Sequence, residues 1–233
     1  MTTPKLPDAE RFWMAERQRL TDEIAAEALA TSGLTGRRSF APPIMDAINR
    51  VPRQEFVPVE HRGRAYENVP LPIGHGQTIS QPYIVALMTD LAAPTKGDAV
   101  LEIGTGCSYQ TAVLAELAGT VCTIEIVPKL QIAAAERLAR LGYHNVVMAT
   151  GDGHRGWPEK APFDAIVVNA AADEIPPALV DQLKPGGRLV LPVQSGPGRQ
   201  HLLLAEKDAE GELRTRPILP VAFVPFRHPI EPS

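Results

Sequence analysis

A glycine-rich loop joins an apolar segment to a helical one in the middle of this 233-residue chain. Gly104 and Gly106 let the backbone pass close beneath a ligand, where a Cβ atom would collide. A dinucleotide fingerprint would need a third glycine where Tyr109 stands, so NAD and FAD are disfavoured. Glu102, two residues before the first glycine, favours a cofactor with a cationic end and no pyrophosphate. S-adenosylmethionine, with its ammonium and sulfonium groups, is that kind of molecule.

Two more acidic residues follow later strand-like segments. Glu125 comes about 20 residues after the first glycine, where a carboxylate can accept hydrogen bonds from both ribose hydroxyls of an adenosine. Asp152, between Gly151 and Gly153, has the position to accept from the adenine amino group. A single acid at a strand end is commonly a loop cap or a solvated charge. Acids at three consecutive strand ends favour one shared cofactor site.

The elements that must position these residues alternate between strands and helices. Strands are expected at residues 99–103, 121–126, 146–149, 163–168 and 188–192. Helices are expected at residues 81–91, 109–117 and 128–141. This alternation predicts parallel βαβ units with right-handed crossovers. Residues 200–206 and 213–226 predict an antiparallel hairpin that closes one edge of the sheet.

The N-terminal part of the chain has a different pattern. Residues 8–31 have the spacing of an amphipathic helix that Gly33 would stop, and residues 43–49 predict a short helix. Residues 57–77 are rich in Pro and Gly and retain apolar side chains, so we expect an ordered loop region there.

We expect one domain over residues 1–233. Residues 1–80 would be a helical segment with a substrate loop, and residues 81–226 would be the core.

Composition disfavours several classes of protein. The 23 Lys and Arg residues are fewer than the 27 Asp and Glu residues, and this balance argues against a nucleic-acid partner. Cys107 and Cys122 are too few for a disulfide scaffold and lack metal-ligand spacing. We find no secretory signal and no apolar run near the roughly 20 residues of a membrane helix. We therefore expect a reduced, cytoplasmic protein with no metal and no membrane association.

The most specific signal in the chain is the sequence LPIGHGQTISQPY at residues 71–83. The other matching motifs are VLEIGTGCSY at 100–109, GDG at 151–153, APFDAI at 161–166, QLKPGG at 182–187 and FVPF at 223–226. Together they resemble the protein-L-isoaspartate O-methyltransferase family over about residues 20–226. The resemblance implies an α/β, Rossmann-like, S-adenosylmethionine-dependent methyltransferase. Its doubly wound, mostly parallel seven-stranded sheet would have an antiparallel C-terminal edge and an N-terminal helical segment.

The resemblance also implies an activity and a set of site residues. Enzymes of this family methylate the α-carboxylate of L-isoaspartyl residues in damaged proteins and peptides, and the ester then cyclises to a succinimide that hydrolyses partly to aspartate. Ser80 matches the active-site serine, and Thr78, Ile79 and Val224 match substrate-binding positions. S-adenosylmethionine would leave as S-adenosylhomocysteine. The predicted cofactor-binding residues are Gln77, Glu102, Gly104, Thr105, Gly106, Cys107, Glu125, Asp152 and Gly153.

This chemistry needs no general base, because a carboxylate with a pKa near 4 is already ionised at neutral pH. Ser80 would therefore orient the carboxylate, and its place before a helix also suits an N-cap. Two positions depart from the family. Cys107-Ser108 replaces the usual Ser-Gly, so the loop lacks its third glycine, and Asn169 replaces a common threonine.

Three alternatives stay open at this point. A peptide-specific aspartate O-methyltransferase of a biosynthetic pathway would use the same chemistry. A nucleic-acid methyltransferase acting on amino groups would need an Asn/Asp-Pro-Pro-aromatic motif, where this chain has Asn169 followed by alanines. A non-catalytic binding module would keep the sheet and lose the cofactor. The sequence does not determine the oligomeric state.

Overall fold

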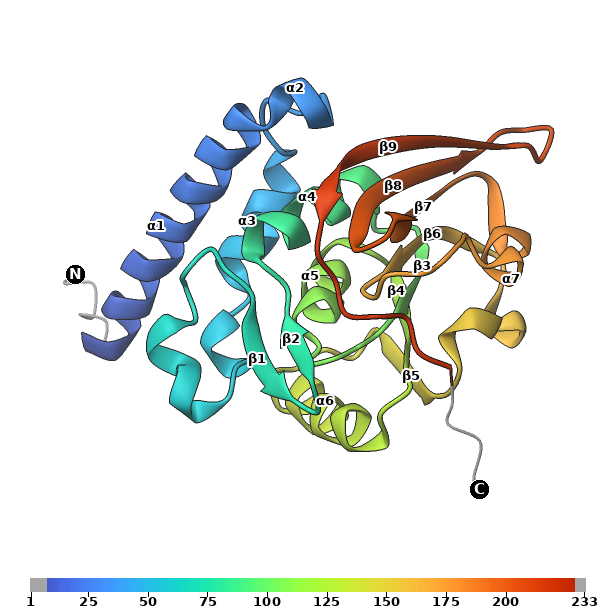
Figure 1. Cartoon of the computed structure of the whole chain (residues 1–233). Coiled ribbons are helices and arrows are strands. Elements are labelled where there is room, and N and C mark those ends of the chain that lie inside the picture. Colours follow the sequence, from blue (N-terminus) through green and yellow to red (C-terminus); the bar gives the residue numbers. More distant parts are fainter. Residues whose placement is uncertain (1–7, 229–233) are drawn as a thin grey trace.

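The computed structural model describes residues 8–228 and has a seven-stranded sheet at its centre (Figure 1). The spatial order of the strands is β5-β4-β3-β6-β7-β8-β9. Their bounds are β3 (Ala99–Ile103), β4 (Thr120–Glu125), β5 (Val146–Thr150), β6 (Phe163–Val168), β7 (Leu183–Gly196), β8 (Arg199–Lys207) and β9 (Leu213–Val221). The first five are parallel, whereas β8 and β9 add antiparallel. The predicted mostly parallel sheet with an antiparallel C-terminal edge is confirmed.

Helices fill the connections between strands. The α-helices are α1 (Asp8–Ala30), α2 (Ser32–Thr35), α3 (Pro42–Arg50), α4 (Pro82–Ala92), α5 (Tyr109–Leu117), α6 (Pro128–Arg140) and α7 (Pro177–Asp181). The 3-10 turns are η1 (Arg53–Glu55), η2 (Val59–Arg64), η3 (Gly153–Arg155) and η4 (Pro158–Lys160). Proline opens α4 and α6 because the first helical residue has no intrahelical N–H bond to lose. No helix within residues 8–228 has the length and apolarity needed to cross a membrane.

Strand order reverses direction at β3, whose two neighbours in the sheet are β4 and β6. Loops that leave the carboxyl ends of such strands diverge and open a crevice, where ligands of α/β proteins bind. Side chains alternate between the faces of β3: Val100 packs into the core that includes α1, α3, α4 and α5, and Leu101 and Ile103 pack into the core that includes α7. The glycine loop therefore lies on a scaffold that is buried on both sides.

Several local predictions are wrong. Gly33 does not stop the helical region, because α2 continues through it and the chain turns at Gly36, which has a left-handed φ of 70°. The expected loop of residues 57–77 contains most of a hairpin, β1 (Leu71–Gly74) and β2 (Gln77–Ile79). Strands of three or four residues are too short to show a periodicity of two.

The N-cap expected at Ser80 is also wrong. Helix α4 starts at Pro82, so Gln81 is the cap residue, and its side chain makes no capping bond. The hydroxyl of Ser80 thus does not cap the N-terminus of this helix.

Candidate active site

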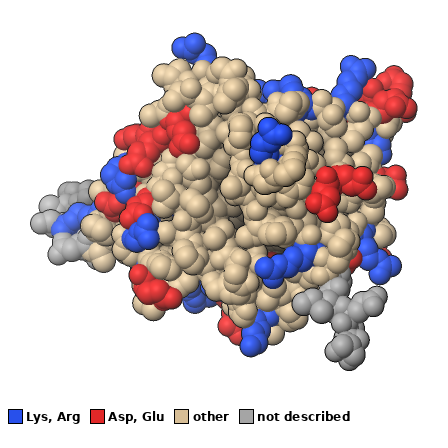
Figure 2. Space-filling view, viewed as in Figure 1, with Lys and Arg blue, Asp and Glu red and all other residues tan. Residues whose placement is uncertain are grey.

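A pocket opens at the carboxyl ends of β3 and β4 with an empty volume of about 810 Å³, part of it open solvent. The hollow near the centre of Figure 2 lies where β2 and the C-terminal segment approach each other in Figure 1. Most side chains around this hollow are uncharged in that view, and charged groups lie mainly toward the rim. The stretches of chain that line the pocket are far apart in sequence and include residues 77–80, 103–107, 124–126 and 224–227.

The carboxylate of Glu125 holds the glycine loop by a hydrogen bond to its backbone. Glu125 is 4% exposed, and its Oε2 accepts from the backbone N–H of Gly106 at 2.7 Å. Its Oε1 accepts from the N–H of Val127 at 2.9 Å. Gly104 has a φ of 88°, a conformation that a Cβ atom would strain. Glu125 and both loop glycines line the pocket, as do Thr105 and Cys107.

Glu102 lies beneath the pocket and does not line it. Its carboxylate is fully buried and accepts from Thr111 at 2.5 Å, from Thr123 at 2.7 Å and from the Asn169 amide at 3.0 Å. Burial raises the pKa of Glu102 to about 7, although these three hydrogen bonds lower it in part. The Asn169 amide also donates to the carbonyl of Gly104 at 3.1 Å and lines the pocket. Glu102 therefore acts on the pocket only indirectly, because the Asn169 amide that donates to it lines the pocket.

Asp152 and Gly153 are adjacent, but the structure gives them different places. Asp152 does not line the pocket; its Oδ1 accepts from the backbone N–H of His154 at 3.0 Å and lies 2.9 Å from the ring Nδ1. Burial raises the pKa of Asp152, but the contacts with His154 outweigh it and the net shift is downward. Gly153 does line the pocket. A Cβ atom there would lie 2.2 Å from Ile103 and 3.0 Å from Phe226, so only glycine fits.

A second pocket adjoins the first and leads along α4 toward β9. Thr78, Ser80, Asn169 and Val224 line both pockets, whereas Gln77 and Ile79 line only the first. The remaining walls of the second pocket are mainly apolar or uncharged, with one carboxylate, Glu27 of α1. Three of the predicted catalytic and substrate-binding residues, Thr78, Ser80 and Val224, therefore lie at the boundary that the two cavities share.

Sequence reasoning missed the residue that supports Ser80. Arg53 is fully buried, and its guanidinium donates to the carbonyls of Ser80 at 2.9 Å and Ala65 at 2.8 Å. Its Cζ atom also lies 4.7 Å from the centre of the Tyr109 ring at the start of α5. Arg53 thus connects the loop that carries Ser80 to the helix that follows the glycine loop. An arginine in a polar stretch carries no sequence signal for such a role.

The C-terminal segment of residues 222–228, here called the strap, was also misjudged. The strand expected at residues 213–226 is too long, because β9 ends at Val221. The strap then crosses the end of β6: the N–H of Ala171 donates to Val224, and the N–H of Phe226 donates to Ala171, both at 2.8 Å. Phe226 and Arg227 line the pocket in consequence. A crossing held by a few long-range bonds leaves no periodic pattern in the sequence.

Comparison with known proteins identifies the family. The model of the family described as protein-L-isoaspartate(D-aspartate) O-methyltransferase matches residues 28–229. The chain belongs to this family. Protein-L-isoaspartate O-methyltransferase 2 of Syntrophobacter fumaroxidans is 57% identical over 212 residues, covering 91% of this chain and 86% of that protein. Protein-L-isoaspartate O-methyltransferase 1 of Cupriavidus necator is 56% identical over 211 residues, covering 91% and 82%.

Solved structures have the same fold as this protein-L-isoaspartate O-methyltransferase family member. One protein-L-isoaspartate O-methyltransferase has a TM-score of 0.77 at 30% identity, covering 90% of this chain and 65% of its own. A Plasmodium falciparum protein, crystallised with S-adenosyl-L-homocysteine, has a TM-score of 0.74 at 23% identity, covering 91% and 98%. The predicted Rossmann-like methyltransferase fold is confirmed.

Proposed function

We propose that this protein transfers a methyl group from S-adenosylmethionine to the α-carboxylate of L-isoaspartyl residues in damaged proteins and peptides, which starts their repair. The observation that carries the proposal is the boundary shared by the two cavities, where Ser80 and Val224 line both. One cavity has the features of a cofactor site, and the other is an open groove suited to a peptide. Family membership supplies the reaction that joins them.

The residues of the first cavity fit S-adenosylmethionine. Glu125 is a buried carboxylate at the pocket wall, suited to ribose hydroxyls. Gly104 has a left-handed φ of 88° and Gly153 has no room for a Cβ atom, so bare backbone lines the pocket at both positions, and Ile126 and Phe226 offer apolar surface to a flat purine. When bound, S-adenosylmethionine supplies a methyl group already activated by its sulfonium. The direct contacts proposed for Glu102 and Asp152 stay predictions.

The protein itself has to position the acceptor. The substrate carboxylate is ionised at neutral pH and acts as the nucleophile, so no side chain has to remove a proton. Ser80 is suited to donate its hydroxyl hydrogen to one carboxylate oxygen and leave the other directed at the methyl group. Such alignment in an enclosed site can supply several kcal/mol of barrier reduction. Arg53 holds the Ser80 carbonyl and thereby fixes the loop from behind.

A set of matched peptides tests this function. We would offer the protein labelled S-adenosylmethionine with an isoaspartyl peptide, its aspartyl isomer and an unmodified control. Transfer confined to the isoaspartyl peptide is the expected result. Equal transfer to the aspartyl isomer would point to a dedicated peptide methyltransferase, and absence of S-adenosylhomocysteine binding by calorimetry would point to a binding module. Either result would overturn the proposal.

The domain division at residue 80 and a cytoplasmic location remain predictions. Both cysteines are free and buried, and each thiol has its pKa raised by burial. The rate of methyl transfer in the assay above should therefore be the same with and without a reductant.

A further inference from the structure

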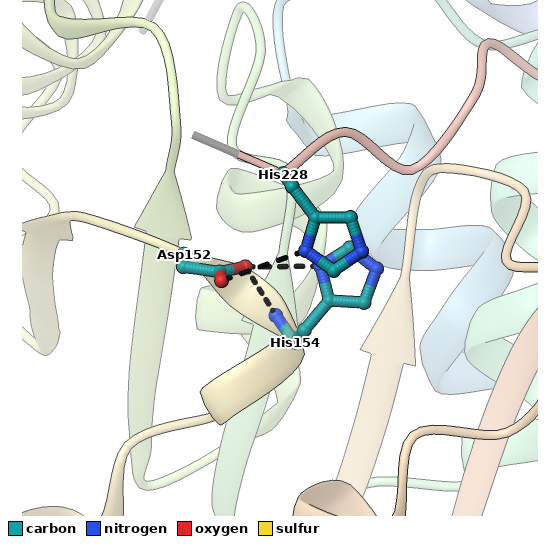
Figure 3. A group of neighbouring side chains, drawn as sticks. All are labelled: Asp152, His154 and His228. Carbon is teal, nitrogen blue, oxygen red and sulfur yellow. Dashed lines mark hydrogen bonds and ion pairs between the residues drawn. The ribbon is translucent and has the colours of Figure 1, made fainter. Parts of the chain in front are cut away.

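Three side chains that can bind metal ions meet beside the cofactor pocket (Figure 3). Asp152 follows β5, His154 lies in the turn η3, and His228 comes from the strap. One ligand atom from each residue lies within 4.8 Å of the other two. Over residues 8–228, no other set of three His, Cys, Asp or Glu side chains comes as close together.

The distances in this cluster suit a small divalent ion. His154 Nδ1 lies 2.9 Å from Asp152 Oδ1, and His228 Nδ1 lies 3.8 Å from Asp152 Oδ2. Metal bonds of about 2.0–2.1 Å in a tetrahedral site separate neighbouring ligand atoms by about 3.4 Å, which lies between these two values. Two imidazole nitrogens and one carboxylate oxygen favour zinc and its neighbours over calcium or magnesium, which prefer oxygen ligands.

Two of the three ligands are already held in place. Asp152 caps η3 by accepting from the backbone of His154, so both side chains belong to one tight turn. The ring of His154 also stacks on Phe226, with centroids 3.7 Å apart and planes inclined by 20°. This contact fixes the ring against the strap. A ligand pair that is ordered before binding loses little entropy when an ion arrives.

The third ligand has to turn. The rings of His154 and His228 lie stacked, 3.8 Å apart and inclined by 13°, whereas a metal ion lies in the plane of each imidazole that binds it. His228 is 72% exposed, so its ring has room to rotate toward the ion. The nearby positive charge of Arg227 is directed elsewhere, because its Nη2 lies 3.7 Å from the Cβ position of Gly76 in the β1–β2 hairpin.

We propose that Asp152, His154 and His228 form a site for a divalent transition-metal ion of the zinc class, which fastens the strap to the turn after β5. The fourth coordination position is left to water. Because Val224, Phe226 and Arg227 line the cofactor pocket, a fastened strap also slows release of the cofactor. This second part rests on the proposed function, whereas the metal site itself does not.

Calorimetric titration with ZnCl₂ tests the site, using the full chain without a polyhistidine tag and without cofactor. One equivalent should bind to the wild type. His228→Ala should weaken zinc binding by at least about tenfold, since loss of a group that only supports a metal ligand already costs about tenfold or more. His154→Phe should do the same, and its ring keeps the stack on Phe226. His144→Ala removes an exposed histidine elsewhere and should change nothing.

Zinc binding no tighter in the wild type than in these two ligand variants would overturn the site. Circular dichroism checks that each variant is folded. If His154→Phe does not fold, the zinc affinity of His228→Ala alone tests the site, because residue 228 is largely exposed and its substitution should leave the fold intact. The release rate of S-adenosylhomocysteine, measured with and without zinc, tests the second part. If the wild type releases S-adenosylhomocysteine at the same rate with and without zinc, the proposal that the metal ion slows cofactor release is overturned. Failure to bind S-adenosylhomocysteine at all would instead count against the proposed function.

Discussion

The two halves of the proposed site are built differently. On the cofactor side, Glu125 and Glu102 accept hydrogen bonds at both carboxylate oxygens, so the groups around the glycine loop are mutually satisfied. On the acceptor side, the hydroxyls of Thr78 and Ser80 have no partner within residues 8–228. The loop that carries them is held through its backbone by Arg53.

This difference fits the two kinds of ligand. A single cofactor of fixed shape is bound best by side chains that are already held in place, since little conformational entropy is then lost on binding. Damaged peptides share one carboxylate but differ in their side chains. The unpaired hydroxyls of Thr78 and Ser80 are free to bind that carboxylate. The open groove has room for the different side chains that flank it in the peptide.

The largest expected effect concerns the buried carboxylate of the cofactor half. The pKa of Glu102 is raised by burial from its ordinary 4.5 to about 7, so the folded state binds more protons than the unfolded state between these values. The free energy of unfolding should therefore fall as pH rises from about 4.5 to above 7, by about 3 kcal/mol in total. Glu102→Gln should remove this fall.

Urea unfolding at several pH values between 5 and 8 measures the difference between the variant and the wild type. Glu210→Gln, which changes an exposed carboxylate, should keep the wild-type pH dependence. Parallel profiles for Glu102→Gln and the wild type would show that Glu102 does not titrate as a buried acid.

The next effect separates the two halves directly. Glu125→Gln replaces one of two acceptor oxygens by an amide, so either Gly106 or Val127 loses its bond. The neutral amide also weakens the bond that we propose Glu125 accepts from a ribose hydroxyl. A hydrogen bond to a charged group contributes about 1.5–3 kcal/mol, so the Kd for S-adenosylhomocysteine should rise about tenfold to hundredfold. The KM for an isoaspartyl peptide at saturating cofactor should stay the same. A comparable change in that KM would mean that the halves are not independent.

Ser80→Ala tests the acceptor half. Loss of the orienting hydroxyl should lower kcat at least about tenfold, equivalent to about 1.4 kcal/mol of barrier. The Kd for S-adenosylhomocysteine should not change, because the cofactor half is intact. Ser195→Ala, at an exposed serine of β7, is the matched control. Wild-type turnover by Ser80→Ala would remove the serine from the mechanism.

The smallest effect is expected at the position where the family usually has glycine. Ser108 is buried and has a φ of 66°, a left-handed conformation that strains an L-residue. Ser108→Gly should raise the free energy of unfolding by less than about 1 kcal/mol, since relief of strain is partly offset by glycine's greater freedom when unfolded. Ser32→Gly, in helix α2, should have the opposite sign in the same urea experiment. Destabilisation by Ser108→Gly would show that its hydroxyl bond to Cys107 outweighs the strain.

The sequence by itself determined the parts of the molecule that depend on local pattern. Helix α5 and strand β6 have the bounds that were expected, because both are apolar segments bounded by turn residues, as buried elements of a parallel sheet are. The glycine loop and the carboxylates at strand ends were also found, since parallel strands bring their carboxyl ends to one edge. The motif around Ser80 then indicated the family.

Only the tertiary structure decided which partner each side chain meets. Arg53 supports Ser80, Asp152 faces two histidines, and the strap ends beside β5, although nothing in the local sequence marks these contacts. The sequence accordingly predicted no metal site, because His154 and His228 are far apart along the chain. Local pattern is set by neighbours in sequence, whereas hydrogen bonds, burial and shifted pKa values depend on groups that meet only after folding.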